Sequence, residues 1–536
     1  MFPVAAVKTQ TEVELKFLVP AGARAAVAAE MARGTATLQR MTLAARYLDT
    51  EDRRLARHGI AWRLRREGRR WIQALKAPGS NALERFEHEV ERPDASHDAS
   101  EHAGTPAGDR LIALLRRARA DGVEPGVRFQ TEVRRTTRKI RTQGALVEVA
   151  FDEGRMLSAG AAQRVREIEF ELISGAVGPM LALAERWRRR FGLIYDPRSK
   201  AERGDQLAEG SPFPPLRKAS QPSYSHRALP AGSFGSVVDE CLAQITRNAI
   251  GLIEGDPNLR VEHVHQLRVG IRRIRSAVRS FRGWAPSPPA ELVEGLRLLF
   301  ATLGLARDHD VLDDGVVAEL AKYGAPPLSV PAAAPGPDPA EVVASGDTQR
   351  LFLAWIAWRA NLDGALLGEG SAVVPKPAEA VAVEGGIVLG AGDVGEAVAS
   401  RSAPDDAQAF RRNVGRRLRR WHRRLVADWQ SFDELDEASL HALRKRSKRQ
   451  RYAVEFFAPL LKRRNAERYL IALTVFQDRM GELNDLFVAR ARYQSLVASD
   501  PAAWFALGWL AARIADVRAL AKPELGRLAK LDPPTA

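Results

Sequence analysis

The chain contains only one cysteine, Cys241, among its 536 residues. A single cysteine excludes an internal disulfide framework, and no Cys/His spacing typical of a zinc site is present. The sequence also lacks a run of about 18 apolar residues, and residues 1–10 lack the apolar segment of a signal peptide. Residues 381–398 are apolar, but several glycines and three acidic residues interrupt them, which favours a loop. We therefore expect a soluble cytoplasmic protein with no membrane partner.

Acidic residues are in deficit. The chain has 81 Lys and Arg against 66 Asp and Glu, which gives a net charge of +15 at pH 7. Such a surplus indicates a polyanionic partner, either a nucleic acid, a membrane surface or a polyphosphate, and charge alone does not choose among them. The hydrophobic fraction of 45% is ordinary for a globular protein, and the length predicts two or three domains.

Strand-like alternation of polar and apolar residues dominates the first two hundred residues. It occurs in seven segments: 12–18, 61–66, 71–76, 85–91, 131–140, 146–151 and 166–172. Helical periodicity appears at 22–32 and 179–191. A stretch rich in Pro and Ser follows, and nearly everything after it is helical in pattern. The predicted organisation is a strand-rich domain at 8–205, a linker at 206–229 and a helical domain at 230–525, with loops at about 324–346 and 368–404.

Charged residues gather on one face of these strands. Alternate side chains of a strand share a face, so Glu12, Glu14 and Lys16 lie together, opposite apolar neighbours. The same argument groups further charged residues into shared faces: Arg63 with Arg65, Arg85 with Glu87 and Glu89, and Glu167 with Glu169 and Glu171. A single strand of this kind fits a solvated sheet face. For the whole set we favour a closed antiparallel barrel with a charged lumen, because three aligned glutamates repel one another unless cations neutralise them.

The order of these motifs resembles the CYTH domain of the triphosphate tunnel metalloenzymes. The matching motifs are Glu12-x-Glu14-x-Lys16, Arg63-x-Arg65, Lys76, Glu167-x-Glu169-x-Glu171 and Ser199-Lys200-x-x-Arg203. The resemblance covers roughly residues 8–205. It implies an eight-stranded antiparallel β-barrel tunnel that hydrolyses triphosphate in the presence of Mg²⁺ or Mn²⁺.

The resemblance also implies roles for individual residues. The implied metal ligands are six carboxylates: Glu12, Glu14, Asp152, Glu167, Glu169 and Glu171. Glu169 and Glu171 would face Glu12 and Glu14, and these four residues with Lys16 would form the catalytic set. The implied phosphate-binding cations are Lys16, Arg63, Arg65, Lys76, Arg135, Lys200 and Arg203. Strand phase favours Arg135 over its neighbour Arg134. The group that takes the proton from water stays open between Glu169, Glu171 and no discrete base.

The helical half contains an internal repeat. His265 is followed by basic residues at offsets of three, seven and ten, and His441 repeats the same offsets. The resulting basic stripes are His265, Arg268, Arg272 and Arg275, continued by Arg279, and then His441, Arg444, Lys448 and Arg451. About forty residues after each histidine, Gly304 precedes Arg307-Asp308 and Gly481 precedes Asn484-Asp485. A stripe of like charges on one helix face is typical of a surface that meets a polyanion.

These stripes resemble the signature of the CHAD domain, the conserved-histidine α-helical domain. The resemblance covers about residues 230–525 and implies an all-α domain of two pseudo-symmetric four-helix units that binds inorganic polyphosphate through the nine basic residues of the two stripes. We expect Asp308, Asp310 and Asp485 to be partners of the basic helices. The stripes contain almost no aromatic residues for stacking on bases, which argues against a nucleic-acid partner.

The sequence therefore predicts an α+β multidomain protein that hydrolyses inorganic triphosphate to diphosphate and phosphate. The same protein is expected to bind polyphosphate, which would associate it with polyphosphate granules. Two alternatives stay open. One is a polyphosphate-binding or granule-targeting protein whose tunnel is weak or inactive. The other is a hydrolase or cyclase acting on an organic triphosphate, such as thiamine triphosphate or ATP, although no pocket for a base or for thiamine is visible in the sequence.

Overall fold

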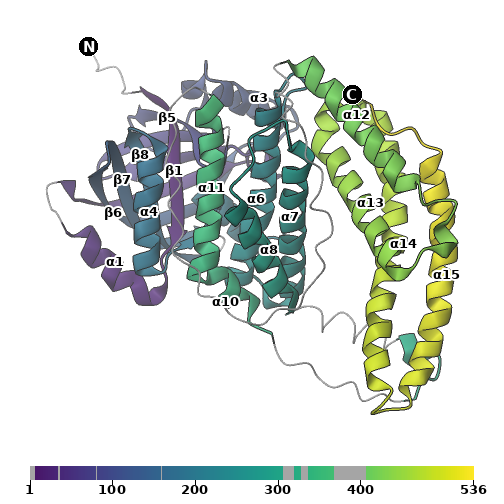
Figure 1. The fold of residues 1–536 in the computed structure, drawn as a ribbon. Helices are drawn as coiled ribbons and strands as arrows, with labels where there is room; N and C mark the ends of the chain where they lie inside the picture. The colour runs from purple at the N-terminus through teal and green to yellow at the C-terminus, as the bar shows by residue number, and fades with distance from the viewer. Residues whose placement is uncertain are drawn as a thin grey trace. The chain divides into compact units, whose positions relative to one another are not determined.

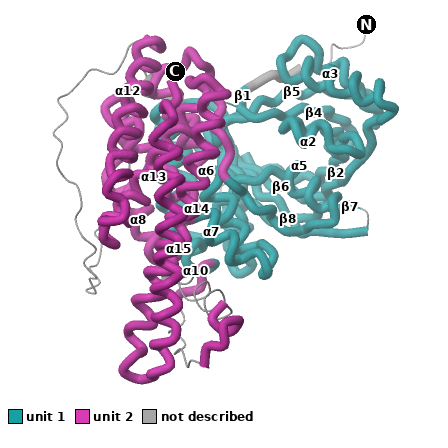
Figure 2. Tube along the Cα trace, turned by 90° about the vertical axis from the view of Figure 1, so that its right-hand side faces the viewer, with its two compact units in different colours: residues 1–218, 242–267, 340–381 teal, residues 219–241, 268–339, 382–536 magenta. Residues whose placement is uncertain are grey.

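The computed structural model describes residues 7–33, 37–79, 81–158, 160–305, 319–326, 336–366 and 406–535. The sequence motif Arg307-Asp308, the residue Asp310 and the predicted loop at 368–404 lie outside these residues. The backbone divides into two compact units (Figure 2). The first comprises residues 1–218, 242–267 and 340–381, and the second comprises residues 219–241, 268–339 and 382–536.

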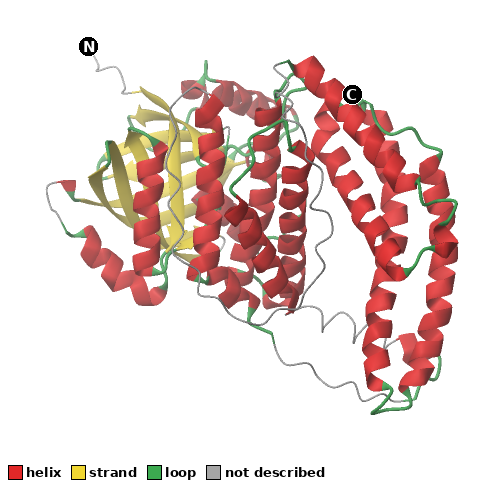
Figure 3. Cartoon of the chain, viewed as in Figure 1, coloured by secondary structure: helices red, strands yellow, loops and turns green. Residues whose placement is uncertain are grey.

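The N-terminal region is a closed antiparallel barrel of eight strands (Figures 1 and 3). The strands are β1 (Val7–Leu18), β2 (Gln39–Asp49), β3 (Ala61–Glu67), β4 (Arg70–Pro78), β5 (Glu84–Arg92), β6 (Gly126–Thr142), β7 (Ala145–Ser158) and β8 (Ala161–Ser174). Their order is β5-β4-β3-β2-β6-β7-β8-β1, and β5 pairs back with β1 to close the ring. A two-residue strand, β9 (Ile194–Tyr195), adds to the end of β1. The predicted barrel is confirmed.

Strand β2 is the one barrel strand that the alternation pattern did not predict. Its register places Ala45 opposite Arg65 and Tyr47 opposite Arg63, so its apolar side faces the same way as the charged sides of the other strands. Its outward side carries exposed polar residues such as Arg46. Unlike the other strands, β2 therefore has its apolar side inward and its polar side outward. A pattern of charged inner faces does not predict such a strand.

Helices cover the apolar outer face of the barrel. In chain order these are α1 (Arg24–Met31), α2 (Arg54–Arg57), α3 (Pro106–Ala120) and α4 (Val177–Phe191). Helix α5 (Lys200–Ala208) packs instead against inner-face residues, since Leu207 clusters with Val133 and Val165. Phe170 of β8 makes edge-to-face contacts with Phe17 of β1 and with Trp187 of α4, each at 5.8 Å between ring centroids. Large buried aromatic groups of this kind stabilise the barrel from outside and leave its interior to charged residues.

Beyond residue 229 the described chain is mainly helical, as predicted. Its helices are α6 (Pro230–Glu254), α7 (Arg260–Phe281), α8 (Ala290–Leu305), α10 (Pro339–Ala344), α11 (Gly346–Leu366), α12 (Ala407–Val426), α13 (Glu437–Phe457), α14 (Arg463–Leu496) and α15 (Ala503–Ala529). Helix α10 corrects the loop expected at 324–346. Pro339 is tolerated in the first turn because its missing N–H would have no intrahelical partner there, and Ala, Glu and Val follow it. None of the described helices is long and apolar enough to span a membrane.

The duplicated helices end at a shared aromatic cluster in the second unit. Phe281, the last residue of α7, lies 4.9 Å from Phe457, the last residue of α13, between ring centroids. Phe234 and Phe410 add their rings at 5.0 Å and 6.3 Å from Phe281. The two copies of the basic pattern thus lie on helices that meet at corresponding ends.

Candidate functional site

The strand register brings the predicted charged residues onto one inner surface. Lys16 stands opposite Glu169, and Asp152 stands between Glu167 on β8 and Arg135 on β6. Ion pairs also cross between strands that are not neighbours, as from Arg135 on β6 to Glu169 on β8 at 2.6 Å. Such contacts place these side chains on one face of the sheet, and closure of the ring by β1 and β5 makes that face the interior. Arg134, by contrast, is exposed and pairs with Glu153 at 3.1 Å, which agrees with the strand phase that favoured Arg135.

Three carboxylates form a tight cluster at the centre of this surface. Oxygens of Asp152, Glu167 and Glu169 all lie within 4.8 Å of one another, and Asp152 and Glu167 are completely buried. Three cations surround them. Lys200 Nζ lies 2.7 Å from Asp152 and 2.8 Å from Glu169 and also contacts Glu167, Arg135 lies 2.6 Å from both Asp152 and Glu169, and Arg203 lies 2.7 Å from Glu167.

Electrostatics keep Asp152 and Glu169 ionised. Burial alone would raise the pKa of Asp152 and of Glu169, but Arg135 and Lys200 outweigh it and hold both pKa values below their ordinary range. In the same way, burial would lower the pKa of Lys200, yet Asp152, Glu167 and Glu169 raise it well above its ordinary value. Asp152, Glu169 and Lys200 are therefore charged at neutral pH, which suits a charged substrate.

Helix α5 delivers Lys200 and Arg203 to the cluster. Ser199 caps the helix, since its hydroxyl accepts the Glu202 N–H at 3.1 Å, and the two cations share a face because they are three residues apart. Gly204 permits close approach to the barrel: a Cβ at this position would lie 2.0 Å from the ring of Phe129. The helix thus seats against β6 only because position 204 has no side chain.

A second charged group lies on β1, β4 and β5. Lys76 Nζ is 2.6 Å from Glu12 and 3.0 Å from Glu87. Burial and the hydrogen bond to Glu87 raise the pKa of Glu12 to about 8. The pKa of Glu87 moves the other way despite burial, because Lys76 holds it well below its ordinary value. Glu87 belongs to this site although the sequence analysis placed it only on a charged strand face.

Arg63 and Arg65 form the basic wall on β3. Arg63 lies 3.2 Å from Glu87, and Arg65 lies 3.2 Å from Glu89 and 2.5 Å from Glu67. Burial lowers the pKa of Arg65, and repulsion from Arg63 lowers it further. Burial also lowers the pKa of Lys16. An anion that approaches such cations stabilises their charged form, so these residues favour a bound phosphate.

Glutamates stand in direct register on three neighbouring strands. Glu171 of β8 is opposite Glu14 of β1 on one side and Glu148 of β7 on the other. Arg85 neutralises Glu14 at 2.7 Å. Like charges directly opposite each other destabilise a sheet unless a cation is shared between them. Glu148 was missed by the sequence analysis, although it lies four residues before Asp152 and thus on the same strand face.

The carboxylates fit a hard divalent cation. Every ligand on offer is an oxygen, which suits Mg²⁺ and Mn²⁺ and excludes the sulfur and imidazole sets typical of zinc. The column formed by Glu14, Glu171 and Glu148 and the cluster at Asp152, Glu167 and Glu169 each concentrate negative charge on the inner surface. Glu12 belongs neither to this column nor to this cluster, because it forms an ion pair with Lys76 and a hydrogen bond with Glu87.

The basic stripes of the helical region also approach each other. In the second unit, Arg272 of α7 acts electrostatically on Arg444 and Lys448 of α13. Burial, Arg444 and Arg272 together lower the pKa of Lys448 to about 7, so this ammonium is only partly charged at neutral pH. Asp485 offsets a part of this repulsion. Crowded cations that destabilise one another in this way suit a polyanion.

Other members of the stripes make local contacts. The guanidinium of Arg268 stacks on Phe300 at 4.6 Å, His441 Nδ1 lies 3.2 Å from the Asn484 side-chain oxygen, and Arg451 pairs with Glu455 at 2.8 Å. His265 and Arg275 are half-buried, whereas Arg279 is exposed. Arg451 is thus partly neutralised on its own helix.

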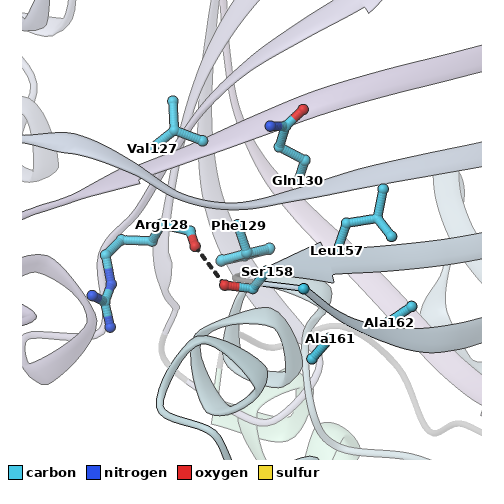
Figure 4. A pocket seen from close by; sticks show the side chains of 9 residues that line it. Val127, Arg128, Phe129, Gln130, Leu157, Ser158, Ala161 and Ala162 are labelled. Carbon is cyan, nitrogen blue, oxygen red and sulfur yellow. Dashed lines mark hydrogen bonds between the residues drawn. The ribbon is translucent and has the colours of Figure 1, made fainter.

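A pocket of about 300 Å³ lies at the start of β6 and the β7–β8 turn (Figure 4). Val127, Phe129 and Leu157 contribute apolar groups to it, and the Ser158 hydroxyl donates to the Arg128 carbonyl at 2.8 Å. No predicted site residue lines this pocket. We therefore place the candidate site in the charged barrel interior.

Comparison with known families agrees with the geometry. The model of the CYTH domain matches residues 10–204, and the model of the CHAD domain matches residues 236–494. The chain combines a CYTH domain with a CHAD domain. The barrel and its charged interior form the CYTH domain, and the CHAD domain contains both basic stripes.

Individual relatives match parts of the chain. An inorganic triphosphatase of Haemophilus influenzae is 28% identical over 166 residues, which are 31% of this chain and 46% of that protein. The chain thus matches about half the length of this curated relative. Among solved structures, the CHAD domain of Ricinus communis is 28% identical, with a TM-score of 0.41 over 59% of this chain and 98% of that one. A Hippeastrum protein described as having a dominant triphosphatase activity is 19% identical, with a TM-score of 0.26 over 37% and 96%.

Proposed function

We propose that the CYTH domain hydrolyses inorganic triphosphate to diphosphate and phosphate and that it requires Mg²⁺ or Mn²⁺. The main support is the barrel interior, in which buried lysines and arginines stand beside a cluster of three carboxylates. Basic residues bind phosphate oxygens, and carboxylates bind hard cations. The activity of the Haemophilus relative agrees with this assignment.

The reaction demands positioning and charge neutralisation more than covalent help. Water attacks a terminal phosphorus and gives up its proton, the bridging P–O bond breaks, and diphosphate departs as the leaving group while the attacked phosphorus becomes phosphate. Lys16, Arg63, Arg65, Lys76 and Arg135 would hold phosphate oxygens along the tunnel, with Lys200 and Arg203 at the carboxylate cluster. A divalent cation held by Glu14, Glu171, Glu169 and their carboxylate neighbours would neutralise charge that develops on the phosphate oxygens. Glu169 and Glu171 are the candidate groups to orient the water.

An inorganic substrate is favoured over an organic triphosphate. Tyr47 and Phe129 of the barrel stack on each other at 4.3 Å between centroids and are only 5% and 4% exposed. Their faces are covered, so this pair offers no platform for a nucleobase or a thiamine ring. Hydrolysis of thiamine triphosphate, cyclisation of ATP and a purely polyphosphate-binding role are the competing functions.

A phosphate-release assay decides among these functions. Triphosphate, ATP, thiamine triphosphate and long-chain polyphosphate would each be incubated with the full chain and Mg²⁺ or Mn²⁺. We expect selective release from triphosphate that EDTA abolishes. Release mainly from an organic triphosphate would replace the proposed substrate, and no release from any compound would favour the binding-only function.

We also propose that the CHAD domain binds inorganic polyphosphate through the two basic stripes. The support is the mutual repulsion of Arg272, Arg444 and Lys448, which a polyanion would relieve. A cytoplasmic location at polyphosphate granules would follow. Fluorescence microscopy of the tagged protein in cells that accumulate polyphosphate, with Arg272→Ala/Arg444→Ala as the comparison, tests this location.

Polyphosphate binding is expected to weaken as the pH rises through about 7, where Lys448 loses its charge in the free protein. The bound polymer favours the charged ammonium, so binding at pH 8 should take up a proton. Isothermal titration calorimetry with long-chain polyphosphate in buffers of different ionisation enthalpy measures this uptake. The variant Lys448→Arg, which stays charged, should bind without it. Equal proton uptake in both proteins would refute the role of Lys448.

A further inference from the structure

Two charged residues of α6 form ion pairs with the segment that carries Lys200. Glu254 accepts a hydrogen bond from Arg198 at 2.6 Å, and Arg247 forms a bidentate ion pair with Glu202, whose second contact is 3.0 Å long. Arg198 and Glu202 stand two residues before and two residues after Lys200. Arg247 and Glu254 are seven residues apart, which places them on the same face of α6, two turns from each other. The helix therefore holds the Lys200 segment at both ends.

Asp196 connects this set of ion pairs to strand β1 of the barrel. Arg198 donates two hydrogen bonds to Asp196, at 2.9 Å and 2.8 Å, and both residues are buried, at 3% and 1% exposure. The Asp196 N–H in turn donates to the carbonyl of Lys16 at 3.1 Å. Bidentate pairs between buried groups fix geometry as well as charge. Glu254 is thus linked through Arg198 and Asp196 to a second predicted phosphate-binding residue.

Helix α6 belongs to the CHAD match from residue 236 onward, whereas Lys16 and Lys200 belong to the CYTH match. Residues 242–267 nevertheless form one compact unit with the barrel, and Asn248 of α6 adds hydrogen bonds to both backbone groups of Arg217. The boundary between the two sequence families consequently runs through one structural unit.

We propose that Arg247 and Glu254 are positioning residues of the triphosphate site, which hold Lys200 and Lys16 in the geometry that binds phosphate. This inference rests on the proposed function of the tunnel. It assigns to the CHAD part of the chain a direct structural share in the CYTH site. Residues that orient a binding group through a second contact typically change affinity or activity by 10-fold to 100-fold when they are replaced.

The test uses the full chain and the variants Arg247→Ala and Glu254→Gln. Triphosphate affinity is measured by calorimetry in EDTA, and kcat and KM are measured with Mg²⁺. We expect the Kd and KM for triphosphate to rise about tenfold in each variant, with a smaller change in kcat and little change in melting temperature. Arg247→Lys should recover part of the affinity, and the charge exchange Arg247→Glu/Glu202→Arg should recover more than Arg247→Glu alone.

Arg119→Ala is the matched control, because Arg119 makes an exposed ion pair with Glu124 at 3.0 Å and lies on α3, which contributes no residue to the site. Unchanged Kd and KM in both α6 variants, or an equal loss in the control, would overturn the inference. If the wild-type protein binds triphosphate without hydrolysing it, the proposed function fails and the Kd values alone decide the positioning role. A wild-type protein that does not bind triphosphate overturns both.

Discussion

Replacement of Glu14 by glutamine is expected to lower triphosphate turnover by roughly a thousandfold with either Mg²⁺ or Mn²⁺, because loss of a charge-stabilising group in phosphoryl transfer has effects of this size. Glu14 is half-buried, stands in register with Glu171 and pairs with Arg85 at 2.7 Å. The substitution keeps the shape of the side chain and removes its charge. Steady-state phosphate release measures the loss, and circular dichroism checks that the fold is retained.

Glu132→Gln serves as the control for this change. Glu132 lies on the outer side of β6 and pairs there with exposed Arg155 at 2.8 Å, so its loss should leave turnover unchanged. Near-normal turnover of Glu14→Gln with both metals would exclude Glu14 from the metal site. A loss of the same size in Glu132→Gln would show that the effect does not come from the tunnel.

Replacement of Lys200 by methionine should destabilise the barrel by about 3–5 kcal/mol at pH 7, the usual cost of removing one partner from a buried ion network. Lys200 contacts all three carboxylates of the central cluster. Without it, the pKa values of Asp152 and Glu169 should rise. Carboxylates with raised pKa values regain stability as they are protonated, so the difference from wild type should narrow as the pH falls from 7 toward 5.

Calorimetric melting of the full chain measures this effect in EDTA and again with Mg²⁺ or Mn²⁺. A divalent cation can replace the lost positive charge, so added metal should raise the melting temperature of Lys200→Met more than that of wild type. Lys139→Met, which removes an exposed lysine of β6, is the control and should melt like wild type. A variant as stable as wild type at pH 7, or one indifferent to metal, would contradict the role of Lys200 as the neutralising group.

Local pattern was sufficient for much of the architecture. Seven of the eight barrel strands follow from alternation of polar and apolar residues, since the two-residue period of a strand sets which side chains share a face. The same period separated Arg135 from Arg134 without any structure. The offsets of the duplicated histidines located α7 and α13, because a period of 3.6 residues identifies helical stripes equally well. Strand β2 was not predicted, because its apolar side and not a charged side points inward.

Most charged residues of the barrel interior were predicted from the sequence, Glu148 being an exception, but the grouping of these charges was not. Period two alone determined that Glu12, Glu14 and Lys16 share one strand face and that Glu167, Glu169 and Glu171 share another. Pairing of β1 with β8 and closure of the barrel place both faces in one interior. Which of them meet depends on register and closure: the pairing of β7 with β8 joins Asp152 to Glu167, and Lys76 holds Glu12 away from the cluster. The close packing of α5 on β6 depends on Gly204. The ion pairs between α6 and the segment around Lys200 join residues about fifty positions apart in the chain. Such long-range contacts are selected by the packing of whole elements, which no local pattern encodes.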